Sequence, residues 1–535
     1  MSLTTKLLLV FITVLNTRWI LYMIAYPLVL PPVSMAAAAH GGKWWNPCRF
    51  LLLPLAPALT STLGLVSLSA FVLASLVMWF RKYRLRFLLR SSIFIVTSIS
   101  LVHFVCYQIS NTNHEVCVLA YITSDRLWLP YSAVIYITLL VIARYYCCKP
   151  VNITKSLLNV GFSHLKSQAR TRRTGFGHMV RDRLKQGDPG SVPPVFPNGW
   201  IPIVESSEVA KGAVVSVTAL GQRFCVFRGE GGEAYVLDAY CPHLGADLSA
   251  GGTVEGDCIE CPFHGWQFSG KDGACKKIPY SCKVPDVART KKWLSCEVNA
   301  FIFVWFHAEN EDPYWEMPPV VPVHTGKWTY RGRTEHEVHC HIQEIPENGA
   351  DVAHLHQLHS TSVFLGSRWM DYTSYLNFVT HEWQPEWERD EHRPHVGRIK
   401  LSQLTKFCGF EVPFSRISLD IEQIGPATVH LHLKTWFGNG VLLQHIIPEG
   451  PLSQRVIHLL YTESTFRQLP ANLLVMAEAT MLERDIAVWN NKKFLRNPIL
   501  VREDRLISRY RRWYQQFYSS NSPTLQSLRE RTLEW

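Results

Sequence analysis

Two short loops in the middle of the chain each offer one cysteine and one histidine. Cys241 and His243 are separated by one residue, and Cys261 and His264 are separated by two. Two thiolates and two imidazoles can hold a [2Fe-2S] cluster, with the sulfur ligands on one iron and the nitrogen ligands on the other. The neutral nitrogen ligands raise the reduction potential above that of an all-cysteine cluster. The spacing therefore predicts a centre that transfers one electron at a time.

The same four side chains could instead hold a structural zinc ion, because two cysteines and two histidines also form tetrahedral sites. Strand-like runs on both sides of the loops favour the cluster, and the 17 residues between His243 and Cys261 complete the Rieske spacing. Gly245 and Gly265 follow the two histidines, where chain reversal favours a residue without a Cβ. Cys258 lies close by, but it lacks a matching pair of histidines, so we leave it outside the site.

A second group of metal-binding residues, Asp351, His354 and His359, has the spacing Asp-x2-His-x4-His. Two imidazoles and one carboxylate form a facial triad that leaves iron positions open for dioxygen. His354 and His359 lie roughly 140° apart around an ideal helix of ~3.6 residues per turn, so they converge only if the helix ends or bulges between them. A regular helix would favour His356 with His359. An exposed histidine-rich helix without a metal is the remaining alternative.

The two motifs together resemble those of the Rieske non-haem iron oxygenases, in which Asp-x2-His-x4-His marks the mononuclear iron. The resemblance favours His354 and His359 over pairs with His356. In Rieske proteins of cytochrome bc type an extra cysteine in each loop forms a disulfide, whereas Ala246 and Phe263 stand in those places here. This difference points to oxygenase or ferredoxin relatives.

The third iron ligand must be a distant carboxylate, and Asp485 is the best candidate. It follows a helix-like run from Ala471, with Glu483 and Asp504 as competitors. The segment from Asp485 to Tyr518 resembles the C-terminal region of steroid-acting members of the class. These include bacterial 3-ketosteroid 9α-hydroxylase and, more closely, the animal Neverland cholesterol 7-desaturases.

The Neverland resemblance implies an oxidoreductase that removes hydrogens from C7 and C8 of cholesterol with O2 and NAD(P)H, in steroid hormone biosynthesis. It implies that Asp351 carries an electron from the Rieske histidine of one subunit to the iron ligand of its neighbour, and hence a homotrimer. NAD(P)H would bind a separate reductase, because the chain has no credible Gly-rich dinucleotide fingerprint. Hydroxylation of another steroid or lipid is the alternative reaction. Trp369, Tyr372 and Phe378 are equally typical of a sterol pocket and of an ordinary core.

Four apolar stretches before residue 150 indicate a membrane region, since a spanning helix needs about 20 apolar residues. Asn16 and Arg18 interrupt the first stretch, whose alternative is a cleaved signal peptide. The stretches cover approximately 5–30, 50–80, 92–109 and 127–147.

Basic residues follow the second and fourth stretches, whereas the loops 31–49 and 110–126 are poor in lysine and arginine. The positive-inside tendency therefore predicts four crossings with both termini in the cytosol. We expect a multi-pass protein of the endoplasmic reticulum membrane with cytosolic catalytic domains. The net charge of +11 comes from clusters beside apolar segments, which favours anionic lipid over nucleic acid as their partner.

A chain of this length is expected to form several domains. Residues 1–149 are predicted to be an α-helical transmembrane region, and 150–198 a basic linker that ends in a Pro/Gly-rich run. Residues 199–311 are predicted to form an all-β Rieske domain. Residues 312–535 would form an α+β, helix-grip-like domain that holds the mononuclear iron, with a helix expected around 470–494.

Two alternatives outside the oxygenases remain. A membrane electron carrier would use only the Rieske centre and would lack the second iron. A zinc-stabilised membrane scaffold would be colourless and would contain no acid-labile sulfide.

Overall fold

The structure is a computed structural model that describes residues 148–162, 164–166, 175–186, 188–360 and 379–533, and the single positions 138, 141 and 144. Apart from those three positions, the four apolar stretches lie outside the described residues. Within the described residues, no helix is both long and apolar enough to cross a membrane. All described elements belong to one compact unit, Ser132–Trp535.

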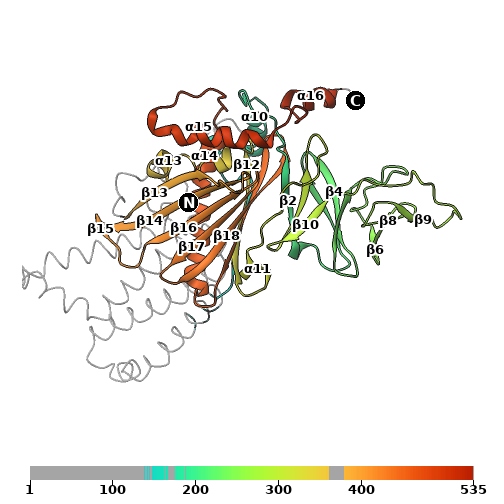
Figure 1. The fold of residues 1–535 in the computed structure, drawn as a ribbon, viewed down its shortest axis with the longest axis horizontal. Helices are drawn as coiled ribbons and strands as arrows, with labels where there is room; N and C mark the ends of the chain where they lie inside the picture. Colours follow the sequence, from blue (N-terminus) through green and yellow to red (C-terminus); the bar gives the residue numbers. More distant parts are fainter. Residues whose placement is uncertain are drawn as a thin grey trace, which may run out of the picture. The chain divides into compact units, whose positions relative to one another are not determined.

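A nine-stranded sheet forms the centre of the C-terminal part (Figure 1). The strand order is β1-β12-β19-β18-β17-β16-β14-β13, and the short β15 pairs with β14. Neighbouring strands are antiparallel, except that β1 runs parallel to β12. The strands are β1 (Val151–Lys155), β12 (Thr329–His339), β13 (Val379–Arg389), β14 (Val396–Phe407), β15 (Phe410–Glu411), β16 (Ile417–Ile424), β17 (Thr428–Thr435), β18 (Gly438–Gly450) and β19 (Ser453–Thr462).

The burial of the strands reflects what covers them. Along β12 every second residue is buried from Thr334 to Val338, as a period of two requires. By contrast, β18 and β19 in the middle of the sheet are buried along most of their length. Such continuous burial is typical of strands that are covered on both faces.

The segment 150–198 was expected to be a linker, and this is wrong for its first residues. Val151–Lys155 forms β1, the edge strand of the nine-stranded sheet. Gly332 on β12 has a φ of 149°, and a Cβ there would lie 2.6 Å from the Val151 carbonyl oxygen, so only glycine lets β1 approach this closely. Further along, Val195 and Phe196 are buried in the core. The segment is basic and polar overall, so its composition did not indicate these short apolar runs.

Three smaller antiparallel sheets build the part that carries the Cys/His loops. Their strand orders are β3-β4-β5, β10-β11-β2 and β6-β7-β8-β9. The strands are β2 (Gly199–Glu205), β3 (Val214–Ala219), β4 (Gln222–Arg228), β5 (Ala234–Asp238), β6 (Thr253–Glu255), β7 (Cys258–Glu260), β8 (Gln267–Ser269), β9 (Cys275–Lys277), β10 (Ser295–Val298) and β11 (Phe301–Phe306).

One hydrophobic core joins this part to the nine-stranded sheet. Ile201 and Phe303 of the smaller sheet belong to the same buried cluster as Leu443 and Leu459 of β18 and β19. At its border, the Leu220 N–H donates to the Pro448 carbonyl at 2.6 Å. The sheet β10-β11-β2 therefore covers one face of the nine-stranded sheet.

Helices also pack against the nine-stranded sheet, and α14 makes the largest contribution, against β12 and β1. It is predominantly buried. The sequence predicted a helix around 470–494, and the observed helix ends earlier, at Trp489. The Asn490 side chain that follows accepts a hydrogen bond from the His339 N–H at 2.8 Å. The helices are α10 (Phe176–Gln186), α11 (Val321–His324), α12 (Glu344–Glu347), α13 (Val352–Leu358), α14 (Gln468–Trp489), α15 (Arg505–Tyr514) and α16 (Leu525–Leu533).

Candidate iron–sulfur and mononuclear iron sites

The two Cys/His loops have the same backbone hydrogen bonds. In the first loop the Cys241 N–H donates to the Ala246 carbonyl at 2.8 Å, and in the second the Cys261 N–H donates to the Trp266 carbonyl at 2.8 Å. In each loop the glycine after the histidine donates back to the cysteine carbonyl, with a positive φ of 76° or 70° that favours glycine. The two loops therefore have matching backbone structures. The chain reversal that was expected from the sequence at Gly245 and Gly265 is observed.

The side chains of the loops face one another. The rings of His243 and His264 lie 4.7 Å apart at 70°, and the Trp266 indole stacks on His243 at 4.6 Å. Both cysteines are 2% exposed. Burial raises the pKa of the Cys241 thiol to about 11, with Cys261 adding to the effect, so a metal is needed to hold it as a thiolate. His243 Nδ1 is buried without a hydrogen-bond partner in the described structure, as expected of an atom reserved for a metal.

The geometry of the Cys/His loops does not match a single tetrahedral zinc. A tetrahedral zinc requires four ligand atoms within about 2.3 Å of one point. Among the described residues, the one group of three or more possible ligands whose atoms all lie within 4.8 Å of one another is His354, His359 and Asp485. The Cys/His loops do not converge in this way, which fits ligands shared between two irons.

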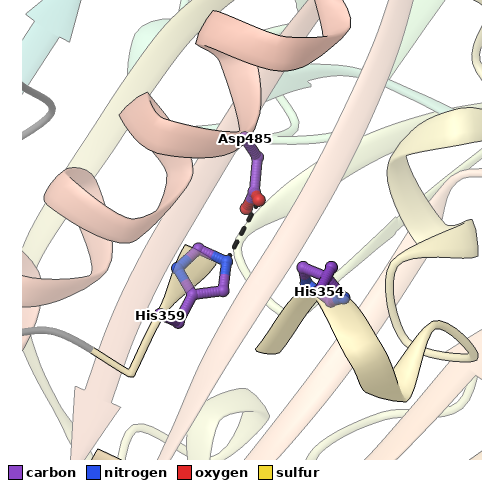
Figure 2. Close-up of side chains that lie close together, drawn as sticks. All are labelled: His354, His359 and Asp485. Carbon is purple, nitrogen blue, oxygen red and sulfur yellow. Dashed lines mark hydrogen bonds and ion pairs between the residues drawn. The ribbon is translucent and has the colours of Figure 1, made fainter. Parts of the chain in front are cut away.

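His354, His359 and Asp485 come together between α13 and α14 (Figure 2). His359 Nε2 lies 3.0 Å from Asp485 Oδ1, and the two histidine rings lie 5.2 Å apart at 87°. Two ligand atoms about 2.1 Å from one metal and at right angles are roughly 3 Å apart, so the observed separation suits two cis ligands. His359 is 3% and Asp485 9% exposed. The donor set is that of a facial triad.

The end of α13 makes this convergence achievable. The helix ends at Leu358, and His359 has φ −112° and ψ 4°, outside helical values. The expectation that the helix must end between His354 and His359 is confirmed. His356 stays on the exposed side of α13, away from the other two histidines.

Asp351 caps the N-terminus of α13 and orients His354. Its Oδ1 accepts the His354 N–H at 3.1 Å, while its backbone carbonyl accepts a hydrogen from His354 Nδ1. This bond places the ring proton on Nδ1 and leaves Nε2 to bind a metal. Burial, opposed by Asp485, lowers the pKa of His354, so the imidazole is neutral at physiological pH, as ligation requires.

Two residues outside the sequence motifs support the triad. Arg484, beside Asp485 on α14, donates from Nη1 to the Leu358 carbonyl at 3.0 Å, and Trp383 of β13 donates from Nε1 to the His359 carbonyl at 3.2 Å. Arg484 is 1% exposed, and burial lowers its pKa to about 10. No sequence motif identifies either residue, because each donates a hydrogen bond to a backbone carbonyl of a residue that is distant in the sequence.

The competing residues lie elsewhere. Glu483 is directed towards β1, where its Oε1 lies 4.0 Å from Lys155 Nζ. Asp504 accepts the Val501 N–H in a short 3₁₀ turn, Arg502–Asp504. Cys258 lies on strand β7. The aromatic residues proposed for a sterol pocket, Trp369, Tyr372 and Phe378, lie outside the described residues.

Comparison with known proteins agrees with this arrangement. Residues 199–288 match the family model of the Rieske [2Fe-2S] domain, and residues 304–518 match that of the 3-ketosteroid 9alpha-hydroxylase C-terminal domain. Together these models cover more than half of the chain.

Relatives match most of the chain. Cholesterol 7-desaturase nvd 1 of Ciona intestinalis is 43% identical over 70% of this chain and 79% of its own length. Cholesterol 7-desaturase nvd of Xenopus laevis is 40% identical over 75% and 88%. A probable 3-ketosteroid-9-alpha-monooxygenase oxygenase component of Rhodococcus rhodochrous is 30% identical over 63% and 84%. The chain therefore belongs to the Neverland family, the nvd-type cholesterol 7-desaturases.

Proposed function

We propose that the protein is a membrane-bound Rieske oxygenase that desaturates cholesterol between C7 and C8. The observation that carries this proposal is the convergence of His354, His359 and Asp485 in a chain that also holds the Cys/His loops. Relatives that are 40% to 43% identical over 70% to 75% of the chain are named cholesterol 7-desaturases. A pure electron carrier has no use for the triad, and a zinc scaffold that used the Cys/His loops would have no use for the triad either.

The overall reaction balances with one NAD(P)H per sterol. One hydrogen leaves C7 and one leaves C8, and two further electrons and protons come from NAD(P)H and solvent. Together they reduce O2 to two molecules of water, and the product is 7-dehydrocholesterol. When bound, the cluster supplies electrons singly and the mononuclear iron supplies a site for O2.

The chain's own residues have distinct roles in this proposal. Cys241 and Cys261 hold one cluster iron, and His243 and His264 hold the other. His354, His359 and Asp485 hold the mononuclear iron. Asp351, whose carboxylate is hydrogen-bonded to the His354 N–H, would provide the path for the electron. NAD(P)H acts through a separate reductase.

The assembly and location are also part of the proposal. A homotrimer would bring the cluster of one subunit to the iron of the next. The exposed Leu244 and Phe263, which neighbour the cluster histidines, support such a subunit contact. The apolar stretches within 1–149 would span the endoplasmic reticulum membrane with both termini cytosolic. The Rieske domain would cover 199–311 and the catalytic domain 312–535.

Membranes containing the protein, incubated with cholesterol, NADPH and a reductase, provide the direct test. We expect a product lighter than cholesterol by two hydrogens, detected by mass analysis. A product that has gained one oxygen would replace desaturation by hydroxylation. Protein that contains the cluster but no third iron would support the electron carrier instead.

A further inference from the structure

Exposed apolar side chains gather at one end of the nine-stranded sheet. Phe410 is 79% exposed on the short strand β15, and Trp436 is 68% exposed in the turn between β17 and β18. Large exposed apolar patches on soluble domains mark interaction sites, because water solvates them poorly. We call this set the aromatic end: Phe407, Phe410, Phe414, Trp436, Phe437, Leu469 and Leu473.

The members of the aromatic end come from three separate segments that the fold brings together. The rings of Phe414 and Trp436 lie 4.3 Å apart, which joins the hairpin after β14 to the β17–β18 turn. Phe437 lies 6.1 Å from Phe466, which precedes α14. Leu469, in the first turn of α14, extends the surface. The aromatic end is therefore one surface and not a set of isolated exposed residues.

The chain enters the described fold at this same end. Lys149 stands two residues before β1, and its carbonyl oxygen accepts the Asn472 side chain of α14 at 2.9 Å. Leu469 and Leu473 flank Asn472 on that helix. The apolar stretches before residue 149 are thus connected to the fold next to the aromatic end.

The composition of this end suits a bilayer interface. Phenylalanine, tryptophan and leucine provide an apolar face, while Arg416 and Arg467 are exposed among them. Aromatic rings lie at the level of lipid headgroups in membrane proteins, and basic side chains pair with anionic lipids there. A contact between two copies of the chain would not require the membrane connection at the same place.

We propose that the aromatic end is a bilayer-contact surface on which the catalytic domain rests. The proposal extends the proposed function, since it also assigns the route of the sterol. Trp383, which holds His359, pairs with Gln403, and Phe407 is four residues further along β14. At about 3.4 Å per residue this is about 14 Å. A sterol that leaves the bilayer at the aromatic end would therefore have to travel only a short distance along β14 to reach the residues that support the metal site.

Cys408 makes the contact measurable in the full-length protein, because it is an exposed cysteine between Phe407 and Phe410 of the aromatic end. Its thiol is labelled with an environment-sensitive maleimide in phosphatidylcholine nanodiscs, and the signal of an identically labelled Cys408→Ser variant is subtracted. We expect quenching by doxyl-labelled lipids and shielding from aqueous iodide. Quenching by iodide alone overturns the proposal. Shielding from both quenchers also overturns it, in favour of a contact between subunits.

A second pair of variants tests the sterol route. Phe410→Asp combined with Trp436→Asp should lose most turnover of cholesterol in nanodisc bilayers and keep turnover of cholesterol presented in detergent micelles. Ile499→Asp, which charges an exposed apolar side chain outside the aromatic end, is the matched control and should retain both activities. The route is overturned if the double variant matches the wild-type protein in bilayers. It is also overturned if the double variant loses turnover equally in nanodiscs and in micelles. If the wild-type protein does not convert cholesterol, the proposed function fails, while the quenching experiment still decides the bilayer contact.

Discussion

At the scale of single residues, Asp351 combines two roles that mutations can separate. Its carboxylate caps α13 through the His354 N–H, and its negative charge acts on the His354 imidazole, where it favours a higher pKa. Removal of an N-cap costs about 1 kcal/mol of stability. An asparagine at this position keeps a capping oxygen but loses the charge.

We therefore predict different outcomes for Asp351→Asn and Asp351→Ala. Both variants should lose turnover, because neither has a carboxylate that can carry the electron. Only Asp351→Ala should also lower the thermal midpoint of unfolding, by the loss of the cap. Steady-state turnover and calorimetry measure the two effects. Full activity of Asp351→Asn would contradict the bridging role.

Substitutions of His359 and of Cys241 should remove different metal centres. His359→Ala removes one of three iron ligands, so iron should fall from about three to about two per chain with the cluster's visible absorbance retained. Cys241→Ser should lose that absorbance and the turnover together. Iron analysis with absorption spectra distinguishes them. Loss of the cluster in His359→Ala would show that the two sites do not form independently.

At the scale of elements, the triad depends on where α13 ends and on which strand supports it. Trp383 on β13 and Arg484 on α14 both donate to backbone carbonyls at the end of α13. These bonds direct His359 out of the helix and towards Asp485. Groups that orient metal ligands contribute to metal affinity without touching the metal.

Trp383→Phe keeps an aromatic ring of similar shape but removes the N–H donor to His359. We expect iron affinity at the mononuclear site to fall about 10- to 100-fold, the range found for such supporting groups. Competition with a chelator followed by iron analysis measures the change. Trp387→Phe is the matched control, since its Nε1 donates to Gln423 and not to the triad. An unchanged affinity in Trp383→Phe would refute the supporting role.

His430 on β17 makes the sheet sensitive to acid. It is 1% exposed, its Nε2 has no hydrogen-bond partner in the described structure, and burial lowers its pKa to about 3. Its folded pKa lies below the unfolded value of about 6.5, so its stabilising contribution is full above that pH and is lost as the pH falls.

At pH 5 the protonation of His430 in the unfolded state lowers the free energy of unfolding by about 2 kcal/mol. Between pH 7.5 and pH 5, the free energy of unfolding of His430→Leu should therefore fall by less than that of the wild-type protein. Denaturant unfolding at both pH values measures the difference. An identical pH dependence in the two proteins would show that His430 is protonated in the folded state.

At the scale of the whole molecule, one hydrophobic core joins the Rieske sheet to the catalytic sheet. Leu244 and Phe263 beside the cluster histidines are exposed, and in the proposed homotrimer they would contact another subunit. The cluster and the iron that exchange an electron would then belong to different chains.

Mixed oligomers test this arrangement. Cys241→Ser lacks the cluster and Asp485→Ala lacks the mononuclear iron, so each variant alone should be inactive. Oligomers that contain both should regain part of the turnover, because one subunit supplies the cluster and its neighbour supplies the iron. Activity of co-expressed, doubly tagged and purified oligomers measures the recovery. No recovery in verified mixed oligomers would place electron transfer within one chain.

Ligand types and short spacings were readable from the sequence alone. The Cys/His loops, their glycines and the Asp351–His354–His359 motif are local, so residue identity and spacing limit their geometry strongly. Asp485 was selected by resemblance, and only the fold brings it to His359 across 126 residues.

Tertiary structure alone decided the remaining features. The pairing of β1 with β12, the support from Trp383 and Arg484, and the aromatic end all join residues that are distant in the sequence. Strand pairing at long range depends on register across the whole sheet, which no local pattern encodes. For that reason the sequence predicted the chemistry of the two sites, and the fold determined how their ligands meet.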